Sequence, residues 1–241
     1  MANDWFQFKE FRIQQDRCAM KVTTDACVFG AWLSDRIPPT PQVLHALDIG
    51  TGTGLLSLML AQQHSTILID AVELDEAAAT QAFDNVCASP FAKQIQVHHA
   101  DFLAYAPGKK YDLIFSNPPF HQQQLKGNNS SRNKAHHDDG LTLEELIPKA
   151  VNMLSEHGKI ALLLPYYRLQ EMLTLAKSHQ LYPLEICSVK QSAQHDFFRV
   201  LFLLGKNDTG STVHTTLQIR DDAPSYSSAF EKLLQPYYLK L

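Results

Sequence analysis

The sequence predicts an α/β domain built on a mostly parallel sheet with helices on both faces. From residue 43 onward, short apolar runs typical of buried strands alternate with helical patterns, as they do in such domains. A glycine-rich turn follows the first apolar run, and an Asn-Pro-Pro turn follows the fourth. Ligands bind at the carboxyl ends of the strands in these sheets, so both turns stand where a site is expected. We expect residues 43–241 to form this domain, and residues 1–42 to form a short extension that covers its site.

Seven strands and the helices between them can be placed in order. Asp75 is expected to cap the helix after the second strand, and Thr142 with Glu145 forms a capping box. The sixth and seventh strands are close enough in sequence to be antiparallel neighbours. The predicted strands are 43–49, 66–73, 95–99, 111–116, 159–165, 184–189 and 197–205, with 213–219 as a further candidate. The predicted helices are 55–63, 75–88, 142–158, 169–179 and 226–234.

The composition excludes several classes of protein. Of the 241 residues, 45% are apolar and 19% are charged, which allows a full core and argues against disorder. No stretch reaches the roughly 18 apolar residues that a membrane helix needs. Residues 1–10 lack the apolar region of a secretion signal, so we expect a cytoplasmic protein. We also expect a monomer. The scattered cysteines fit reduced thiols; they are Cys18, Cys27, Cys87 and Cys187.

The net charge of -4 argues mildly against a nucleic-acid partner. Phosphate backbones are bound by local basic patches, however, which a whole-chain sum conceals. Two clusters could form such patches, and either could equally consist of ordinary solvated charges. The first contains Lys9, Arg12, Arg17 and Lys21, and the second contains Lys126, Arg132 and Lys134.

The glycine-rich turn at residues 47–54 predicts a cofactor site. Gly50, Gly52 and Gly54 let the chain turn sharply and let a ligand approach the backbone. A dinucleotide fingerprint would have a different glycine spacing and would bring a pyrophosphate to the helix. Here an acid, Asp48, precedes the glycines. It suits the cationic amino-acid end of S-adenosylmethionine and would repel a pyrophosphate.

Two further strand ends carry side chains suited to a nucleoside. Glu73, followed by Leu74, ends the second strand, where a carboxylate can accept hydrogen bonds from both ribose hydroxyls. Asp101 follows the third strand and could contact an adenine, with Phe102 packing against it. Asp101 could equally be a turn residue.

The Asn117-Pro118-Pro119-Phe120 turn predicts chemistry on an amine. Two prolines remove two backbone donors and stiffen the turn. The side-chain oxygen of Asn117 and the carbonyl of Pro118 can then accept both hydrogens of one exocyclic NH2 group. Phe120 would stack on the target.

The paired histidines do not predict a metal site. His98-His99, His136-His137 and His195-Asp196 lack the spacing of metal ligands. We therefore expect no metal.

From Leu47 to Phe120 the order and spacing of these elements resemble the class I S-adenosylmethionine-dependent methyltransferases. That resemblance implies a seven-stranded Rossmann-like sheet. The tetrapeptide at 117–120 resembles the (Asp/Asn/Ser)-Pro-Pro-(Tyr/Phe) motif of amino-methyltransferases, which act on adenine N6, cytosine N4, guanine N2 or a glutamine amide. The motif implies the reaction and leaves the substrate open.

Both ends of the chain narrow the substrate. Residues 6–11, 20–32, 199–202 and 226–241 are similar to the bacterial tRNA1(Val) adenine-37 N6-methyltransferase family. The resemblance implies N6-methylation of adenine 37 in the anticodon loop of tRNA(Val). It also implies that a cofactor-covering segment closes over the methionine end of the cofactor, with Asp25 near the ammonium. The residues of that segment are Lys21, Thr23, Thr24 and Asp25. Thr24 or Asp25 could also simply cap a helix.

Adenine 37 lies in the anticodon loop and is unpaired. An enzyme can therefore bring this base into its active site at the cost of only partial unstacking. Phe8, Phe11 and Phe120 are predicted to offer stacking faces, and the basic residues Lys126, Arg132 and Lys134 to contact the RNA. The first alternative is a glutamine N5-methyltransferase of a translation factor, although 42 residues leave little room for the helical domain usual in that class. Others are an amine methyltransferase of rRNA or DNA, a non-catalytic RNA-binding module and an NAD oxidoreductase.

Overall fold

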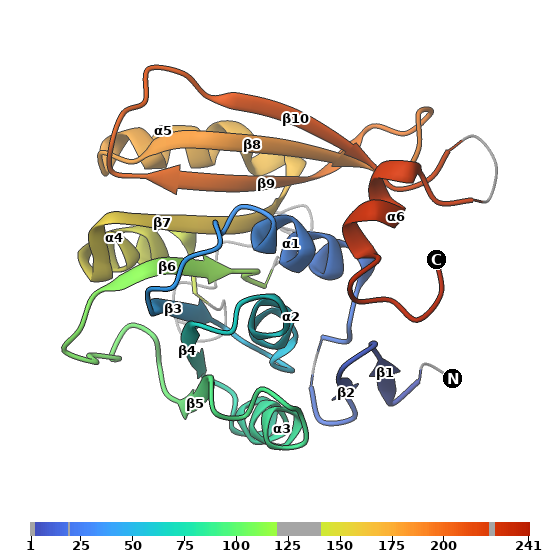
Figure 1. The fold of residues 1–241 in the computed structure, drawn as a ribbon. Helices are drawn as coiled ribbons and strands as arrows, with labels where there is room; N and C mark the ends of the chain where they lie inside the picture. Colours follow the sequence, from blue (N-terminus) through green and yellow to red (C-terminus); the bar gives the residue numbers. More distant parts are fainter. Residues whose placement is uncertain (1–2, 19, 120–140, 222–224) are drawn as a thin grey trace, which may run out of the picture.

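An eight-stranded mixed sheet forms the centre of the computed structural model, which describes residues 3–18, 20–119, 141–221 and 225–241 (Figure 1). The strand order is β10-β8-β9-β7-β6-β3-β4-β5. β9 is antiparallel to β7 and β8, and the other pairs are parallel. The bounds are β3 (Leu44–Ile49), β4 (Ile67–Glu73), β5 (Ile95–His99), β6 (Tyr111–Ser116), β7 (Leu154–Pro165), β8 (Tyr182–Lys190), β9 (Phe197–Gly205) and β10 (Val213–Gln218).

The predicted mostly parallel α/β fold is confirmed, with one strand more than the seven expected. The added strand is β10, which pairs with the outer edge of β8. β7 also begins earlier than predicted, because the chain leaves α4 at Met153 and pairs with β6 from Leu154. The helices are α1 (Thr24–Ser34), α2 (Leu55–Gln63), α3 (Glu76–Cys87), α4 (Leu143–Met153), α5 (Leu169–Ser178) and α6 (Ser228–Leu234).

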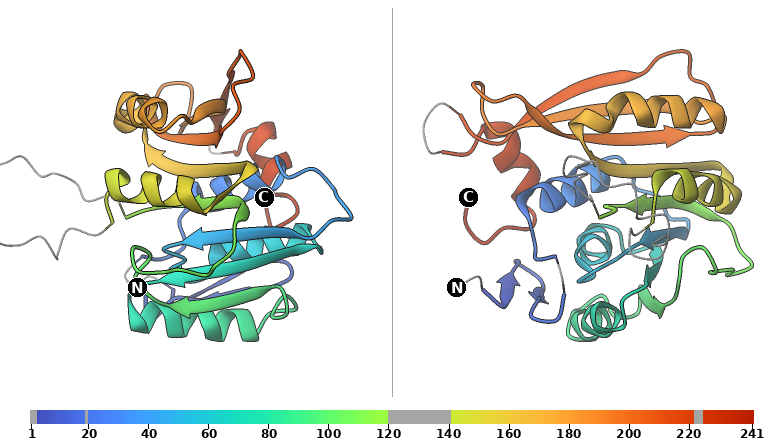
Figure 2. Two further views of the ribbon diagram at one scale, coloured as in Figure 1. Left: turned by 90° about the vertical axis from the view of Figure 1, so that its left-hand side faces the viewer. Right: turned by 180° about the vertical axis from the view of Figure 1, so that it is seen from behind.

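The helices cover both faces of the sheet and bury two apolar clusters (Figure 2). On β9, Leu201 and Leu203 belong to the cluster shared with α1 and α2. Val200 and Phe202 alternate with them and belong to the cluster shared with α4 and α5. This period of two is the pattern expected of a strand buried on both faces. In the described residues, no helix has the length and apolarity needed to span a membrane.

The helix caps set where the elements begin. The side chain of Asp75 accepts a hydrogen bond from Ala78 N at 2.8 Å, so this predicted cap is confirmed. The predicted capping box at Thr142 is also present, with Glu145 Oε2 accepting from Thr142 N at 3.1 Å. For α1 the prediction of Thr24 or Asp25 is wrong by one or two residues. Thr23 is the cap, and its extended backbone lets its hydroxyl accept from Ala26 N.

The sheet order brings the two predicted turns together. β3 lies between β6 and β4, and the chain winds from β3 in opposite directions on its two sides, so this is the switch point of the sheet. The carboxyl ends of β3, β4 and β6 are therefore neighbours. The hydroxyl of Ser116, the last residue of β6, donates to Ile49 O at 2.7 Å and joins two of these ends.

The amino-terminal extension is packed into the rest of the molecule. It begins with an antiparallel ribbon of two strands, β1 (Trp5–Gln7) and β2 (Arg12–Gln14), which the sequence did not predict. Gln14 N donates to the side chain of Asn85 in α3 at 2.9 Å. Lys9 N donates to Tyr237 O at 2.8 Å, so the ribbon joins the two ends of the chain.

Gly158 in β7 should tolerate no side chain. A Cβ placed there would lie 2.8 Å from Tyr111 O and 2.7 Å from the Leu154 side chain, and the carbonyl cannot move without disturbing the pairing of β6 and β7. We expect Gly158→Ala to lower the free energy of unfolding by about 1–3 kcal/mol, measured by urea denaturation. Gln170→Ala, on the exposed surface of α5, is the control. Equal unfolding midpoints for the two variants would contradict this account.

Candidate active site

Asp48 is a fully buried carboxylate with one unpaired oxygen. Its Oδ2 accepts hydrogen bonds from the hydroxyls of Thr51 and Ser57, both at 2.7 Å. Its Oδ1 is buried and has no partner in the described residues. Burial raises the pKa of Asp48 to about 6, and the negative charge of Glu73 raises it further while the two hydroxyls lower it. A cationic ligand would satisfy the remaining oxygen and favour the charged form.

The glycine loop at the end of β3 has the backbone that only glycine adopts at low cost. Gly50, Gly52 and Gly54 have φ angles of 69°, 58° and 82°. Gly54 caps α2 without a side-chain hydrogen bond, and a Cβ there would lie 3.7 Å from Ala82 in ordinary contact, so its positive φ is what requires glycine. Thr51, within this loop, donates to Asp48, so the loop lies beside the buried carboxylate.

Glu73 connects the glycine loop to the end of β4. Its Oε2 accepts from Gly52 N at 2.8 Å, and its Oε1 accepts from the amides of Leu74 and Asp75. A carboxylate offers about four acceptor positions, so one is left for a ligand hydroxyl. A second ribose hydroxyl would have to displace the bond from Gly52. The side chain of Leu74 is 64% exposed and leaves an apolar surface next to this carboxylate.

Asn117 follows β6 and carries the second unpaired oxygen. Its Oδ1 is buried and has no partner in the described residues. Pro118 is buried and Pro119 is exposed. Leaving a buried amide oxygen unpaired costs about 1–3 kcal/mol, so a donor on a ligand is the natural partner. Phe120 lies outside the described residues.

The residues after β5 fit the nucleoside prediction less well. Asp101 Oδ1 accepts from Leu103 N at 2.8 Å, which is the turn role that the sequence left open. Phe102 is 5% exposed and belongs to the apolar cluster under α4, with the ammonium of Lys149 over its ring. Little of this ring is left to pack against an adenine.

The cofactor-covering segment approaches the same edge of the sheet. The backbone N–H of Arg17 donates to the side chain of Gln81 at 2.9 Å, which ties this part of the extension to α3, the helix that follows β4. Burial raises the pKa of the neighbouring Cys18 to about 11. Lys21 donates to Asn3 O at 3.2 Å, and Thr23 and Thr24 are exposed. The carboxylate of Asp25 accepts a hydrogen bond from Arg199.

Phe8 and Phe11 are core residues, which corrects the prediction that they offer stacking faces. They are 0% and 3% exposed and stack on each other with ring centroids 4.6 Å apart. Phe8 also contacts Phe6 and Tyr238. No face of either ring is open to a base.

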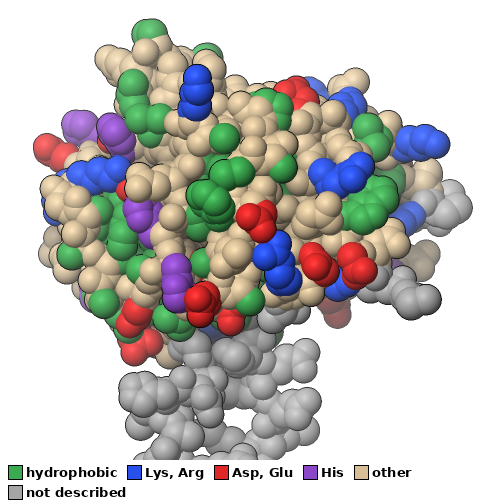
Figure 3. Space-filling view, turned by 90° about the horizontal axis from the view of Figure 1, so that it is seen from below, with side chains coloured by type: hydrophobic (Ala, Val, Ile, Leu, Met, Phe, Trp, Pro, Cys, Tyr) green, Lys and Arg blue, Asp and Glu red, His purple; other side chains and the backbone are tan. Residues whose placement is uncertain are grey.

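The amino-terminal basic residues are used within the molecule. Each contacts a carbonyl, amide or carboxylate oxygen of the chain itself. On the face that Figure 3 shows, basic and acidic side chains are interspersed and form no single basic patch among the described residues. The contacts join Lys9 to Gln235, Arg12 to Gln7, Arg17 to Asp84 and Lys21 to Asp4. The second basic cluster, Lys126, Arg132 and Lys134, lies outside the described residues.

Three aromatic residues that the sequence analysis missed lie at this edge. Pro165, at the end of β7, pairs with Arg199 of β9, so Tyr166 and Phe197 flank the same strand ends. Their ring centroids are 5.0 Å apart, and Tyr167 is 73% exposed. Their positions directly beside predicted strand ends were the available signal.

Among the described residues, no group of three or more His, Cys, Asp and Glu side chains could hold a metal.

Comparison with known proteins gives a consistent family. The model of the methyltransferase small domain family matches residues 31–177. A tRNA1(Val) (adenine(37)-N6)-methyltransferase of Parabacteroides distasonis is 38% identical over 243 residues, covering all of both chains.

Solved structures share the fold at low identity. A predicted O-methyltransferase of Agrobacterium tumefaciens has a TM-score of 0.65 at 16% identity, covering 88% of this chain and 96% of that one. A SAM-dependent methyltransferase of Thiobacillus denitrificans, in complex with S-adenosyl-L-homocysteine, has a TM-score of 0.51 at 17% identity, covering 71% and 69%. The chain therefore belongs to the methyltransferase small domain family, and to the group within it whose curated relatives are named tRNA1(Val) (adenine(37)-N6)-methyltransferases.

Proposed function

We propose that the protein transfers a methyl group from S-adenosylmethionine to N6 of an adenine in tRNA, namely adenine 37 in the anticodon loop of tRNA(Val). The observation that carries this proposal is the buried amide oxygen of Asn117, which has no partner in the described residues. Asn117 follows β6, which is next to β3 with Asp48, and β4 with Glu73 is the strand beyond β3. The names of the full-length relatives support the choice of adenine and of tRNA.

The described residues fit the cofactor. Asp48 Oδ1 would accept from the ammonium of its methionine part, and Glu73 would accept from the ribose through its remaining acceptor position. The positive φ of Gly50 and Gly52 opens the backbone to the ligand. Lys21, Thr23 and Thr24 would cover the methionine end. Asp101 would contact the adenine from the rim, because its side chain is exposed.

S-adenosylmethionine, when bound, supplies an electrophilic methyl group on a sulfonium. Asn117 Oδ1 and Pro118 O would each accept one hydrogen of the target amine. This would draw electron density out of the ring toward the nitrogen, so that its lone pair could take the methyl group as the S–CH3 bond breaks and S-adenosylhomocysteine leaves as a neutral thioether. No strong base is needed, because the amine becomes acidic only after it has attacked. Pro119 keeps the turn rigid, and Phe120 would stack on the base.

Position 37 is unpaired, so the enzyme must unstack the base without separating a base pair. Aromatic faces for neighbouring bases would come from Tyr166, Tyr167 and Phe197, in place of the buried Phe8 and Phe11. Lys126, Arg132 and Lys134 remain candidates for phosphate contacts. A glutamine side-chain amide of a translation factor is the second candidate substrate, because the same two acceptors would hold it.

The test is methylation of bulk tRNA stripped of its modifications, alongside a release factor, with labelled S-adenosylmethionine and nucleoside mass spectrometry. We expect N6-methyladenosine in the tRNA digest. A tRNA carrying guanine at position 37 is the matched control and should stay unlabelled. Label in the release factor alone would replace the tRNA substrate with the glutamine alternative.

Asn117→Ala should reduce kcat at least about 100-fold and leave the Kd for S-adenosylhomocysteine within about threefold, because the amide acts on the amine in the transition state. Single-turnover rates and calorimetry measure the two quantities. If binding and rate fall together, Asn117 holds the cofactor instead.

Glu73→Ala should weaken calorimetric binding of S-adenosylhomocysteine about tenfold or more, because the ribose loses an acceptor and Gly52 N loses its partner. Glu73→Gln keeps an acceptor oxygen and should recover part of the affinity. An unchanged Kd for Glu73→Ala would remove the ribose role.

Cofactor affinity should fall as the pH drops through about 6, the pKa to which burial raises Asp48. The ammonium binds the carboxylate form, which is present above that pKa and lost below it. Calorimetric titrations from about pH 7.5 to about pH 5 would show this acid limb in the wild type. Asp48→Asn should bind weakly throughout and lack the limb. The same limb in Asp48→Asn would assign the titration to another group.

A further inference from the structure

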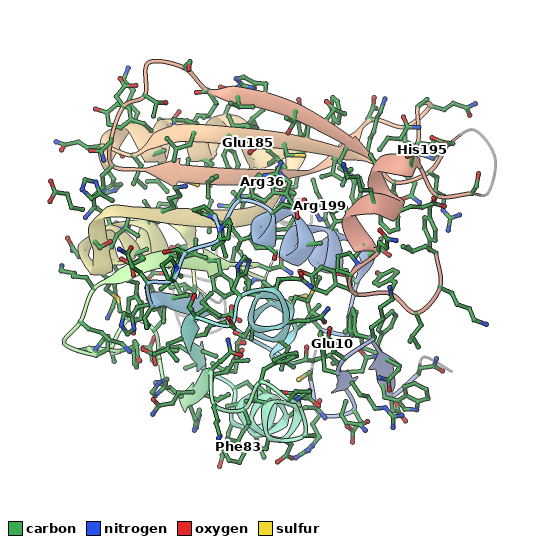
Figure 4. The ribbon with its side chains drawn as sticks, viewed as in Figure 1. Glu10, Arg36, Phe83, Glu185, His195 and Arg199 are labelled. Carbon is green, nitrogen blue, oxygen red and sulfur yellow. The ribbon has the colours of Figure 1, made fainter. Side chains whose placement is uncertain are left out.

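Arg199 makes a short ion pair with the first turn of α1. Its Nε donates to Asp25 Oδ2 at 2.6 Å, and the two side chains are 26% and 13% exposed. Arg199 is on β9, opposite Pro165 at the carboxyl end of β7. The pair therefore spans from α1 to the edge of the sheet that carries the candidate site (Figure 4).

Packing already holds α1 without this pair. Its side chains at 28, 29, 32 and 33 are at most 2% exposed. At its other end a second ion pair joins Arg36 to Glu185 in β8, with Nε and Nη2 donating to the two carboxylate oxygens at 3.0 and 2.7 Å. Removing two charges from water is costly, so a buried pair is weak evidence of a stabilising role. What distinguishes the Asp25–Arg199 pair is its position, because it lies beside the edge of the sheet that carries the candidate site.

Arg199 also contacts the aromatic side of the same edge. Its Nη1 donates to Phe198 O at 3.1 Å, and its guanidinium lies over the Phe198 ring at 5.3 Å from the centroid. The preceding residue, Phe197, packs against Tyr166. One guanidinium thus bridges the start of α1 and the strand end that carries these rings.

We propose that Arg199 is a positioning residue for the cofactor-covering segment, acting through Asp25. The proposal rests on the proposed function, in which this segment covers the methionine end of S-adenosylmethionine. The ion pair with Arg199 fixes Asp25 and the residues that lead into α1. The cofactor-covering segment is then ordered before the ligand binds, which lowers the entropy cost of binding. Because the guanidinium already balances Asp25, the carboxylate for the ammonium is Asp48.

Arg199→Gln, Asp25→Asn and the double variant of the full chain test the coupling. We expect each single change to raise the Kd for S-adenosylhomocysteine and the KM for S-adenosylmethionine about tenfold, with kcat within about threefold. The double variant should be no weaker than the weaker single one, because either change breaks the same pair. Arg199→Lys, which keeps the charge, should recover part of the affinity.

Arg36→Gln is the matched control, because it breaks a similar pair at the other end of α1 (Figure 4). It should lower the melting temperature while leaving the Kd within about twofold. If Arg199→Gln also lowers only the melting temperature, or if its effect adds to that of Asp25→Asn, the positioning role is wrong. Should Arg199→Gln not fold, Asp25→Asn and Arg199→Lys decide in the same way. Failure of the wild type to bind S-adenosylhomocysteine would instead count against the proposed function.

Discussion

The arrangement of the site depends on a buried negative charge that the protein itself only half satisfies. Two hydroxyls bind one oxygen of Asp48, and its other oxygen has no partner in the described residues. β3 is an inner strand between β4 and β6, and Asp48 is 0% exposed, so solvent cannot relieve the cost of desolvating its carboxylate. A cation brought by a ligand removes that cost. The glycine loop, Glu73 and the switch point around them are the surroundings that such a ligand would need.

Local signals in the sequence predicted the regular elements well. The bounds of α2 and β6 match the prediction residue for residue, because each is a mostly apolar segment followed by polar or proline residues that end it. The candidate site was predictable for a related reason, since strand ends in a parallel sheet meet at one edge. β1 and β2 could not be predicted, because three-residue strands have too few positions to show an alternation, and theirs are fixed by contacts with α3 and Tyr237.

Contacts between distant parts of the chain could not be predicted from the sequence. Phe8 and Phe11 have the composition of a stacking surface, and only their packing against Tyr238 shows that they belong to the core. Asp25 has the charge expected near an ammonium, but it is bound to Arg199, 174 residues farther along the chain. The sequence shows that a residue is charged, but the fold determines which residue becomes its partner. Asp48 and Asn117 differ in this respect, because each has a buried side-chain oxygen without a partner in the described residues.

The junction between the amino-terminal ribbon and the end of the chain has a consequence for biosynthesis. Lys9 N binds Tyr237 O, and Phe8 forms a bridge with Tyr238, so the ribbon cannot complete its packing until these last residues have left the ribosome. The strands of the central sheet all precede these residues in the chain, so the sheet can assemble before the ribbon makes these two contacts. A chain truncated before residue 237 would lose these two contacts, and its ribbon would be held by the remaining ones, such as that of Gln14 with Asn85 of α3.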